Sequence, residues 1–197
     1  MVKHIVWGRE KSLPLNKGFG LKKNIAIALD LDGVIANIDD GIKRYFENNN
    51  LKAEYKSWLV TDTKNELAMS VFNDPLFWIN LKPYEDAWYK VNEWFNNGID
   101  IHIVTARRCF AAVEDTIPWL EKWNIGYSKV HFSKFGEKIN IIQNIDPVFM
   151  IEDNPHEINV LKNHNIKCFM RNHWYNFDHA YLMDTINTFH DIDLESL

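Results

Sequence analysis

The sequence predicts an α/β protein whose core is a parallel sheet of five strands with helices on both faces. Five short predicted strands alternate with segments of helical periodicity, a pattern typical of parallel sheets. Each predicted strand ends in polar or charged residues, as expected at the ligand-binding edge of an open sheet. With 197 residues, 46% hydrophobic and 25% charged, the chain suits one globular domain carrying a small insertion.

The first predicted strand is a short apolar run that ends in charge, as expected for a buried strand of a parallel sheet. The five predicted strands span residues 25–30, 99–104, 129–133, 148–151 and 166–170.

Helices are predicted where apolar residues recur three and four positions apart. In residues 84–97 one helical face carries Trp88, Val91, Trp94 and Phe95, and Gly98 ends the helix. Pro118 interrupts the pattern of residues 110–123, so Thr116 is expected to cap a fresh helix there. The predicted helices span residues 39–50, 62–72, 84–97, 110–123, 136–144, 155–163 and 177–189.

The interval between the first two strands is much longer than a simple crossover needs. Its surplus, residues 37–81, contains two predicted helices and many aromatic residues, and is predicted to form a small helical insertion over the strand ends. The core then comprises residues 24–36 and 82–197. Residues 1–23 are an N-terminal extension to which the sequence assigns no role.

Composition argues against several classes of protein. The net charge of −5 is wrong for a general nucleic-acid binder, which needs a basic surface. No apolar run is long enough for a membrane span, and the N-terminus has no apolar core of a signal peptide, so a cytoplasmic location is expected. Cys109 and Cys168 are expected to be buried thiols in a reducing compartment.

Two carboxylates follow the first strand. Asp30 and Asp32 are two residues apart and therefore point to the same side. At about 5 Å, such charges repel by about 3 kcal/mol at an effective dielectric constant of 20. A bound cation or a shared proton would offset this repulsion; alternatively, the pair is a solvated strand end or a helix cap. Gly33 then allows a sharp turn.

Glu152 and Asp153 close the fourth strand and add two more carboxylates at the same edge of the sheet. A site with only oxygen ligands suits Mg²⁺ far better than zinc.

Residues suited to an anion follow the second and third strands. Thr105 and Ala106 would present a hydroxyl and free N–H groups at a helix start, although a simple threonine cap is the alternative. Lys138 lies in the first turn of a predicted helix, where a cation opposes the helix dipole unless it faces an anion. Lys134 is its rival, and either lysine could instead be a solvated surface residue.

In combination, these motifs resemble the haloacid dehalogenase-like hydrolases over roughly residues 24–176. The resemblance implies a Rossmann-like core with a small helical C1 cap, which corresponds to residues 37–81. Motif one matches Ala28-Leu29-Asp30-Leu31-Asp32-Gly33-Val34, motif two Ile103-Val104-Thr105, motif three Lys138, and motif four Met150-Ile151-Glu152-Asp153-Asn154-Pro155.

Within that superfamily the chain is most similar to the 5′(3′)-deoxyribonucleotidases and related nucleotidases. Motif four departs from many of these enzymes in having Glu-Asp where they have Asp-Asp. The similarity is carried by Pro75-Leu76-Phe77-Trp78, Leu81-Lys82-Pro83, Thr105-Ala106-Arg107 and Asp153-Asn154-Pro155.

The resemblance implies a Mg²⁺-dependent phosphomonoesterase. Asp30 would be the nucleophile that forms an aspartyl-phosphate, and Asp32 would protonate the leaving oxygen and then activate water. Mg²⁺ would be held by Asp30, by the backbone carbonyl of Asp32 and by Asp153, with Glu152 behind them or binding through water.

By the same resemblance, the phosphoryl oxygens would be held by Thr105, the N–H of Ala106, and Lys138. Arg107 would contact a second phosphate or a sugar hydroxyl of the substrate, with a surface salt bridge as the alternative.

The insertion is expected to select the substrate, through aromatic rings that form a flat slot for a base. Phe77 and Trp78 are the strongest candidates, although rings at helical spacing also commonly form a core. Trp174-Tyr175-Asn176 could wall the same cleft. The other rings considered are Phe46, Trp58 and Phe72.

The predicted substrate is a small phosphoester, with a nucleoside monophosphate favoured over a sugar phosphate. A non-catalytic phosphate-binding module is the alternative from another class, and the presence of both Asp30 and Asp32 argues against it. The chain lacks a P-loop domain and a basic groove, so polymeric nucleic acid is not an expected partner. A homodimer is allowed.

Overall fold

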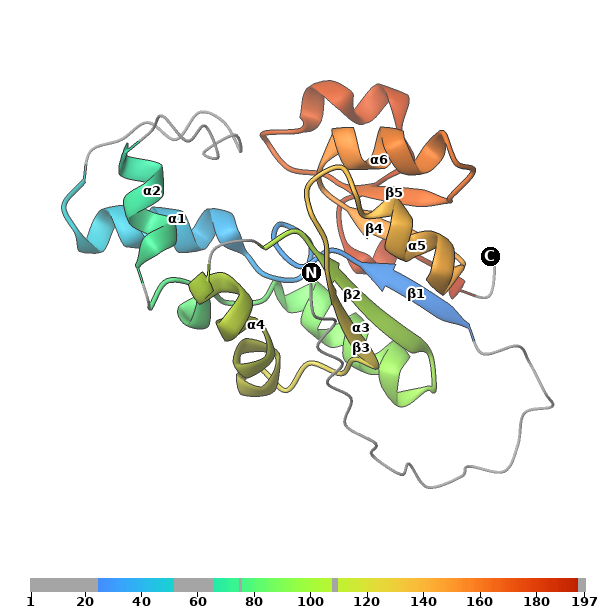
Figure 1. Cartoon of the computed structure of the whole chain (residues 1–197), viewed down its shortest axis with the longest axis horizontal. Helices are drawn as coiled ribbons and strands as arrows, with labels where there is room; N and C mark the ends of the chain where they lie inside the picture. The colour runs from blue at the N-terminus through green and yellow to red at the C-terminus, as the bar shows by residue number, and fades with distance from the viewer. Residues whose placement is uncertain (1–24, 52–65, 75, 108–109, 195–197) are drawn as a thin grey trace.

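A central parallel sheet organises the molecule (Figure 1). The structure is a computed structural model that describes residues 25–51, 66–74, 76–107 and 110–194. The predicted N-terminal extension, Trp58 and Cys109 lie outside these residues. The six strands run in the order β3-β2-β1-β4-β5-β6, all parallel. They are β1 (Ala26–Leu29), β2 (Asp100–Thr105), β3 (Lys129–Phe132), β4 (Met150–Glu152), β5 (Cys168–Arg171) and β6 (Thr185–Ile186).

The register of the sheet determines which residues meet at its edge. Leu29 in β1 pairs with Ile103 in β2 on one side and with Ile151 in β4 on the other. Asp30 therefore comes level with Val104, one residue before the end of β2, and with Glu152, the last residue of β4. This is the edge at which ligands bind in open parallel sheets.

The predicted α/β class and five of its strands are confirmed, whereas the last predicted helix is wrong. Residues 177–189 do not form one helix: a 3₁₀ helix, η3 (Phe177–Leu182), leads into the sixth strand β6, and η4 (Phe189–Asp191) follows. The reason lies in the neighbouring strand. Met170 and Asn172 donate their N–H groups to the carbonyls of Asp184 and Ile186, at 2.8 Å each, which extends the sheet.

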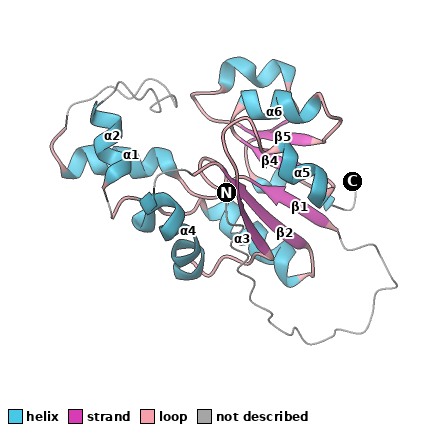
Figure 2. Cartoon of the chain, in the orientation of Figure 1, coloured by secondary structure: helices cyan, strands magenta, loops and turns pink. Residues whose placement is uncertain are grey.

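Helices cover both faces of the sheet, as predicted (Figure 2). On one face α3 contributes Val91 and Trp94 to the larger core cluster, which also contains Ile27 and Leu29. On the other face α5 and α6 pack in a smaller cluster that contains Ala28 and Met150. The helices are α1 (Ile38–Asn48), α2 (Glu66–Asn73), α3 (Glu85–Asn96), α4 (Phe110–Lys122), α5 (Ile139–Ile145), α6 (Pro155–Lys162) and the 3₁₀ helix η2 (Trp78–Asn80).

Helix α4 runs through Pro118 without a break, so the expected fresh start at Thr116 is wrong. The Thr116 hydroxyl donates to the carbonyl of Ala112 at 2.6 Å, one turn earlier, instead of capping a new helix.

The helices α1, α2 and η2 lie between β1 and α3 in the chain, and the two connecting segments run side by side. Ala36 forms an antiparallel bridge with Pro83, and Asn37 donates its N–H to Lys82 at 2.8 Å. Among the described helices, none is both long and apolar enough to cross a lipid bilayer.

Candidate active site

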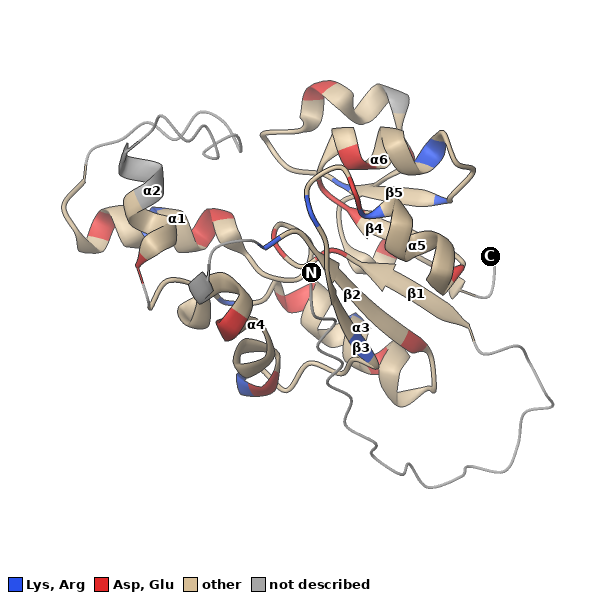
Figure 3. Ribbon diagram, viewed as in Figure 1, with Lys and Arg blue, Asp and Glu red and all other residues tan. Residues whose placement is uncertain are grey.

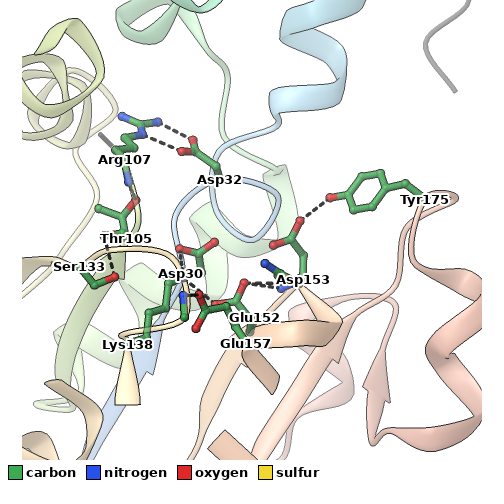
Figure 4. A network of polar contacts seen from close by, with 12 residues as sticks. Asp30, Asp32, Thr105, Arg107, Ser133, Lys138, Glu152, Asp153, Glu157 and Tyr175 are labelled. Atoms are coloured by element: carbon green, nitrogen blue, oxygen red, sulfur yellow. Dashed lines mark hydrogen bonds and ion pairs between the residues drawn. The ribbon is translucent and has the colours of Figure 1, made fainter. Parts of the chain in front are cut away.

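The parallel register gathers polar side chains at the carboxyl ends of β1, β2 and β4. Asp30 follows β1 directly, Thr105 is the last residue of β2, and Glu152 is the last residue of β4. All three are buried. Figure 3 shows acidic and basic residues meeting at this edge of the sheet, and Figure 4 shows the site from close by.

Lys138 bridges two of the carboxylates. Its Nζ donates to Oδ1 of Asp30 and to Oε2 of Glu152, at 2.6 Å each, and only 2% of its side chain is exposed. Lys138 is the N-cap residue of α5. It follows a turn at Gly136, whose backbone is left-handed with a φ of +77°, a conformation that glycine adopts readily. Lys134, its rival, lies at the surface, with 74% of its side chain exposed beside Glu137.

Three carboxylates converge on one point. Asp30, Glu152 and Asp153 each offer an oxygen, and these oxygens lie within 4.8 Å of one another. Burial, together with the charge of Glu152, raises the pKa of Asp30 to about 8. Burial also raises the pKa of Glu152 to about 7, as it does for Asp153 beside Asp30. One ammonium group against three carboxylates leaves this cluster short of positive charge.

The free oxygens of the cluster suit a hard cation. Lys138 and the N–H groups of Asp153 and Asn154 occupy the two oxygens of Glu152. Asp30 bonds Lys138 through Oδ1, and Asp153 accepts from the Tyr175 hydroxyl through Oδ2 at 2.6 Å. Each of these two aspartates keeps one oxygen that can face an ion. These oxygen ligands fit Mg²⁺. Glu152 would not bind the ion directly, because both of its oxygens already accept hydrogen bonds.

Gly33 allows this close packing. Its φ is +81°, and a Cβ at this position would overlap Oδ2 of Asp153 and lie 2.8 Å from the Tyr175 hydroxyl. A glycine is therefore required by the carboxylate behind it as well as by the turn.

Asp32 points away from the three converging carboxylates. Its oxygens accept from Nε and Nη2 of Arg107 at 2.8 and 2.6 Å (Figure 4). This ion pair is buried on the arginine side, since 1% of the Arg107 side chain is exposed. Arg107 thus forms a buried ion pair with Asp32 and not a surface salt bridge, and its contact with substrate stays a prediction.

Thr105 and Ala106 lie where a phosphate site was predicted. The Thr105 hydroxyl oxygen accepts from the N–H of Arg107 at 3.3 Å, which leaves its own hydrogen available as a donor. The Thr105 carbonyl accepts from the N–H of Ser133 at 2.9 Å, so the loop after β3 is held against the end of β2.

Two supporting residues had weak or no sequence signal. Glu157 is buried in the first turn of α6 and accepts a bond from the N–H of Gly136, which fixes the turn that leads to Lys138. Its position four residues after Asp153 is the signal that could have revealed it. Asn176 donates to the carbonyls of Asp153 and Arg171 at 2.8 and 2.9 Å, so the segment after β5 lies against the carboxylate cluster; its role in walling a substrate cleft stays a prediction.

Phe77 and Trp78 lie in the interior of the inserted helices, each 6% exposed. Their rings are 5.1 Å apart, and Trp78 stacks on Phe72 at 5.4 Å. This packing agrees with the alternative that these rings form a core. Phe46 is buried in the same cluster.

A family model matches residues 23–192, and its description is "5′ nucleotidase, deoxy (Pyrimidine), cytosolic type C protein". The chain belongs to this family. Membership makes it a phosphoric monoester hydrolase of the nucleotidase type. Among curated proteins, no sequence matches significantly.

Solved structures share the fold at low sequence identity. The HAD-hydrolase YfnB from Bacillus subtilis has a TM-score of 0.59 at 11% identity, over 86% of this chain and 97% of that one. A predicted phosphatase from Clostridium acetobutylicum gives 0.58 at 11%, over 86% and 96%. The haloacid dehalogenase-like protein SP0104 from Streptococcus pneumoniae gives 0.57 at 12%, over 82% and 92%.

Proposed function

We propose that this protein is a Mg²⁺-dependent 5′(3′)-deoxyribonucleotidase that hydrolyses nucleoside monophosphates through an aspartyl-phosphate on Asp30. One observation carries the proposal: Lys138 bridges Asp30 and Glu152 at the end of the central strand, with Asp153 completing the cluster. A cytoplasmic location and a homodimer belong to the same proposal, and the buried free thiol of Cys168 agrees with a reducing compartment.

Mg²⁺ would be held by Asp30, Asp153 and the backbone carbonyl of Asp32. When bound, it would neutralise the carboxylates and the phosphate charge together. The structure of YfnB from Bacillus subtilis, which shares the fold, is described as bound to magnesium. In this chain, Tyr175 and Lys138 each take one oxygen of a carboxylate and thereby turn the other toward the proposed ion.

Each step of the reaction would then be carried out by a different residue of the chain. An oxygen of Asp30 would attack phosphorus, while Asp32 gives a proton to the leaving oxygen. The Thr105 hydroxyl, the N–H of Ala106 and the Lys138 ammonium would bind the phosphoryl oxygens. Burial opposes the charge on Lys138, yet the adjacent Asp30 and Glu152 carboxylates raise its pKa above the ordinary value, so it is a cation at neutral pH.

A phosphatase for another small phosphoester, such as a sugar phosphate, is the second candidate. The burial of Phe77 and Trp78 supports it, because rings packed inside the insertion do not offer a free face to a base.

Phosphate release from a panel of deoxynucleoside, nucleoside and sugar phosphates, with Mg²⁺ and with EDTA, tests both candidates. Nucleoside monophosphates should be the best substrates, and EDTA should remove the activity. Asp30→Asn should abolish turnover and the acid-stable phosphoenzyme, while circular dichroism stays unchanged. Turnover of sugar phosphates alone would favour the second candidate, and unchanged turnover by Asp30→Asn would remove the mechanism.

A further inference from the structure

Arg107 joins three parts of the molecule in the interior. Two of its nitrogens donate to the oxygens of Asp32, and Nη1 donates to the hydroxyl of Thr116 in α4 at 3.2 Å. The guanidinium carbon also lies 4.9 Å from the ring centroid of Trp78 in η2. Each nitrogen of the guanidinium thus has a partner within the protein, which points to a role directed at Asp32.

The geometry of this ion pair fixes the orientation of a carboxylate. A planar guanidinium that donates two parallel bonds sets the plane of its partner as well as its position. It uses one lone pair on each Asp32 oxygen and leaves the others available. The Asp32 side chain remains 21% exposed, so water can still reach it.

We propose that Arg107 is a positioning residue for Asp32 in the second half of the reaction, when the aspartyl-phosphate is hydrolysed. This inference rests on the proposed function. In that step the oxygen of water bonds to phosphorus, the bond between phosphorus and the Asp30 oxygen breaks, and the proton of the water passes to Asp32. Inorganic phosphate and the free Asp30 carboxylate result. A base that is held at one place and in one plane accelerates this transfer.

Trp78 connects the ion pair of Arg107 and Asp32 to the inserted helices. Its Nε1 donates to the carbonyl of Phe72 at 2.9 Å, and its ring is stacked on that residue. The face that supports the guanidinium is therefore held by the insertion and not by the sheet. The position of Asp32 consequently depends on the packing of the insertion.

The test uses p-nitrophenyl phosphate, whose leaving group departs without a proton and so isolates the second half of the reaction. In Arg107→Gln, kcat should fall by about 10-fold or more, because losing the orientation of Asp32 removes part of the roughly 10²- to 10⁴-fold that a positioned base contributes, while kcat/KM changes by less than about 3-fold. Nitrophenolate should then appear in a burst equal to the enzyme concentration, and the phosphoenzyme should accumulate. Arg107→Lys, which keeps the charge but loses the fork, should give an intermediate kcat.

Two controls separate positioning from a structural effect. In an Asp32→Asn background, Arg107→Gln should add no further loss, because the two residues act as one unit. Trp78→Leu, which removes the aromatic face beneath the guanidinium, should reproduce part of the loss in kcat.

A parallel fall of kcat and kcat/KM in Arg107→Gln without a burst would overturn the inference, as would an added loss on Asp32→Asn. Either result would leave the proposed function standing, because the parent protein is active. A parent protein that releases no phosphate from any substrate would instead overturn the proposed function, and this inference with it.

Discussion

The hydroxyl of Tyr175 donates to Oδ2 of Asp153 at 2.6 Å, across the turn at Gly33. This bond ties the segment after β5 to the carboxylate that follows β4. The same segment is anchored twice more, since Nε2 of His173 lies 2.6 Å from the carbonyl of Gly33 and Asn176 bonds the Asp153 carbonyl. The orientation of Asp153 is thus set from outside its own strand.

Tyr175→Phe should weaken Mg²⁺ binding by about 10-fold, because partners that orient a metal-binding carboxylate contribute 10- to 100-fold to affinity. Isothermal titration of the substrate-free protein with MgCl₂ measures this directly. Tyr181→Phe is the matched control, since Tyr181 is 82% exposed. Equal Mg²⁺ affinity in all three proteins would contradict a role for the hydroxyl.

Lys138→Met should cost the fold about 3–5 kcal/mol, because removing one partner leaves two buried carboxylates without their cation. It should also abolish phosphate release. Lys134→Met removes an exposed lysine and should change stability by less than about 0.5 kcal/mol. Urea unfolding and phosphate assays on both variants distinguish the two lysines; similar losses in both would mean that the ion pairs of Lys138 are unimportant.

Gly33→Ala and Gly98→Ala form a second matched pair. Both glycines have positive φ, at +81° and +85°, so both substitutions should destabilise the fold by about 1 kcal/mol through backbone strain. Only at Gly33 would the new Cβ overlap Asp153, since nothing lies within 4 Å of the corresponding position at Gly98. Mg²⁺ affinity, by titration calorimetry, should fall in Gly33→Ala alone.

His131 should make stability depend on pH. Burial, with His102 and Lys129 nearby, lowers the pKa of His131 from its ordinary 6.5 to about 4. Between these values the unfolded chain binds a proton that the folded protein excludes, so the free energy of unfolding falls as pH drops below 6.5 and levels off near 4. At pH 5 the loss should be about 1 kcal/mol, allowing for solvent screening of a half-buried ring.

His131→Gln should remove that part of the pH dependence. Denaturation of both proteins at pH 7, 6 and 5 provides the comparison, and the difference between them should shrink or reverse as the pH falls. Parallel curves for the two proteins would show that the imidazole does not titrate on unfolding.

The sequence predicts those parts of the fold that carry their own local pattern. Buried runs such as Ala26–Leu29 are apolar throughout and are followed by a charged residue, so the sequence predicts both the strand and the end of the strand where the site lies. The strand Thr185–Ile186 is two residues long and exists because β5 offers unpaired backbone groups, which no local pattern reveals. A helix was predicted there because nearby apolar spacing is compatible with one.

The sequence likewise predicts part of the candidate site. Asp30, Glu152 and Asp153 were expected together because parallel strands end at one edge, and the structure brings them together. The choice between Lys134 and Lys138 depends on the turn at Gly136 and its bond to Glu157, which is a tertiary contact. The pairing of Arg107 with Asp32 joins residues far apart in the sequence and could not be read from spacing.

The burial of Phe77 and Trp78 has a consequence for how this protein can diverge. The two rings stabilise the inserted helices, and Trp78 also supports Arg107, so mutations there would weaken the fold before they altered selectivity. Changes of substrate are therefore expected at other positions around the carboxylate cluster. Directed-evolution libraries should accordingly hold both rings constant and randomise exposed residues such as Trp174.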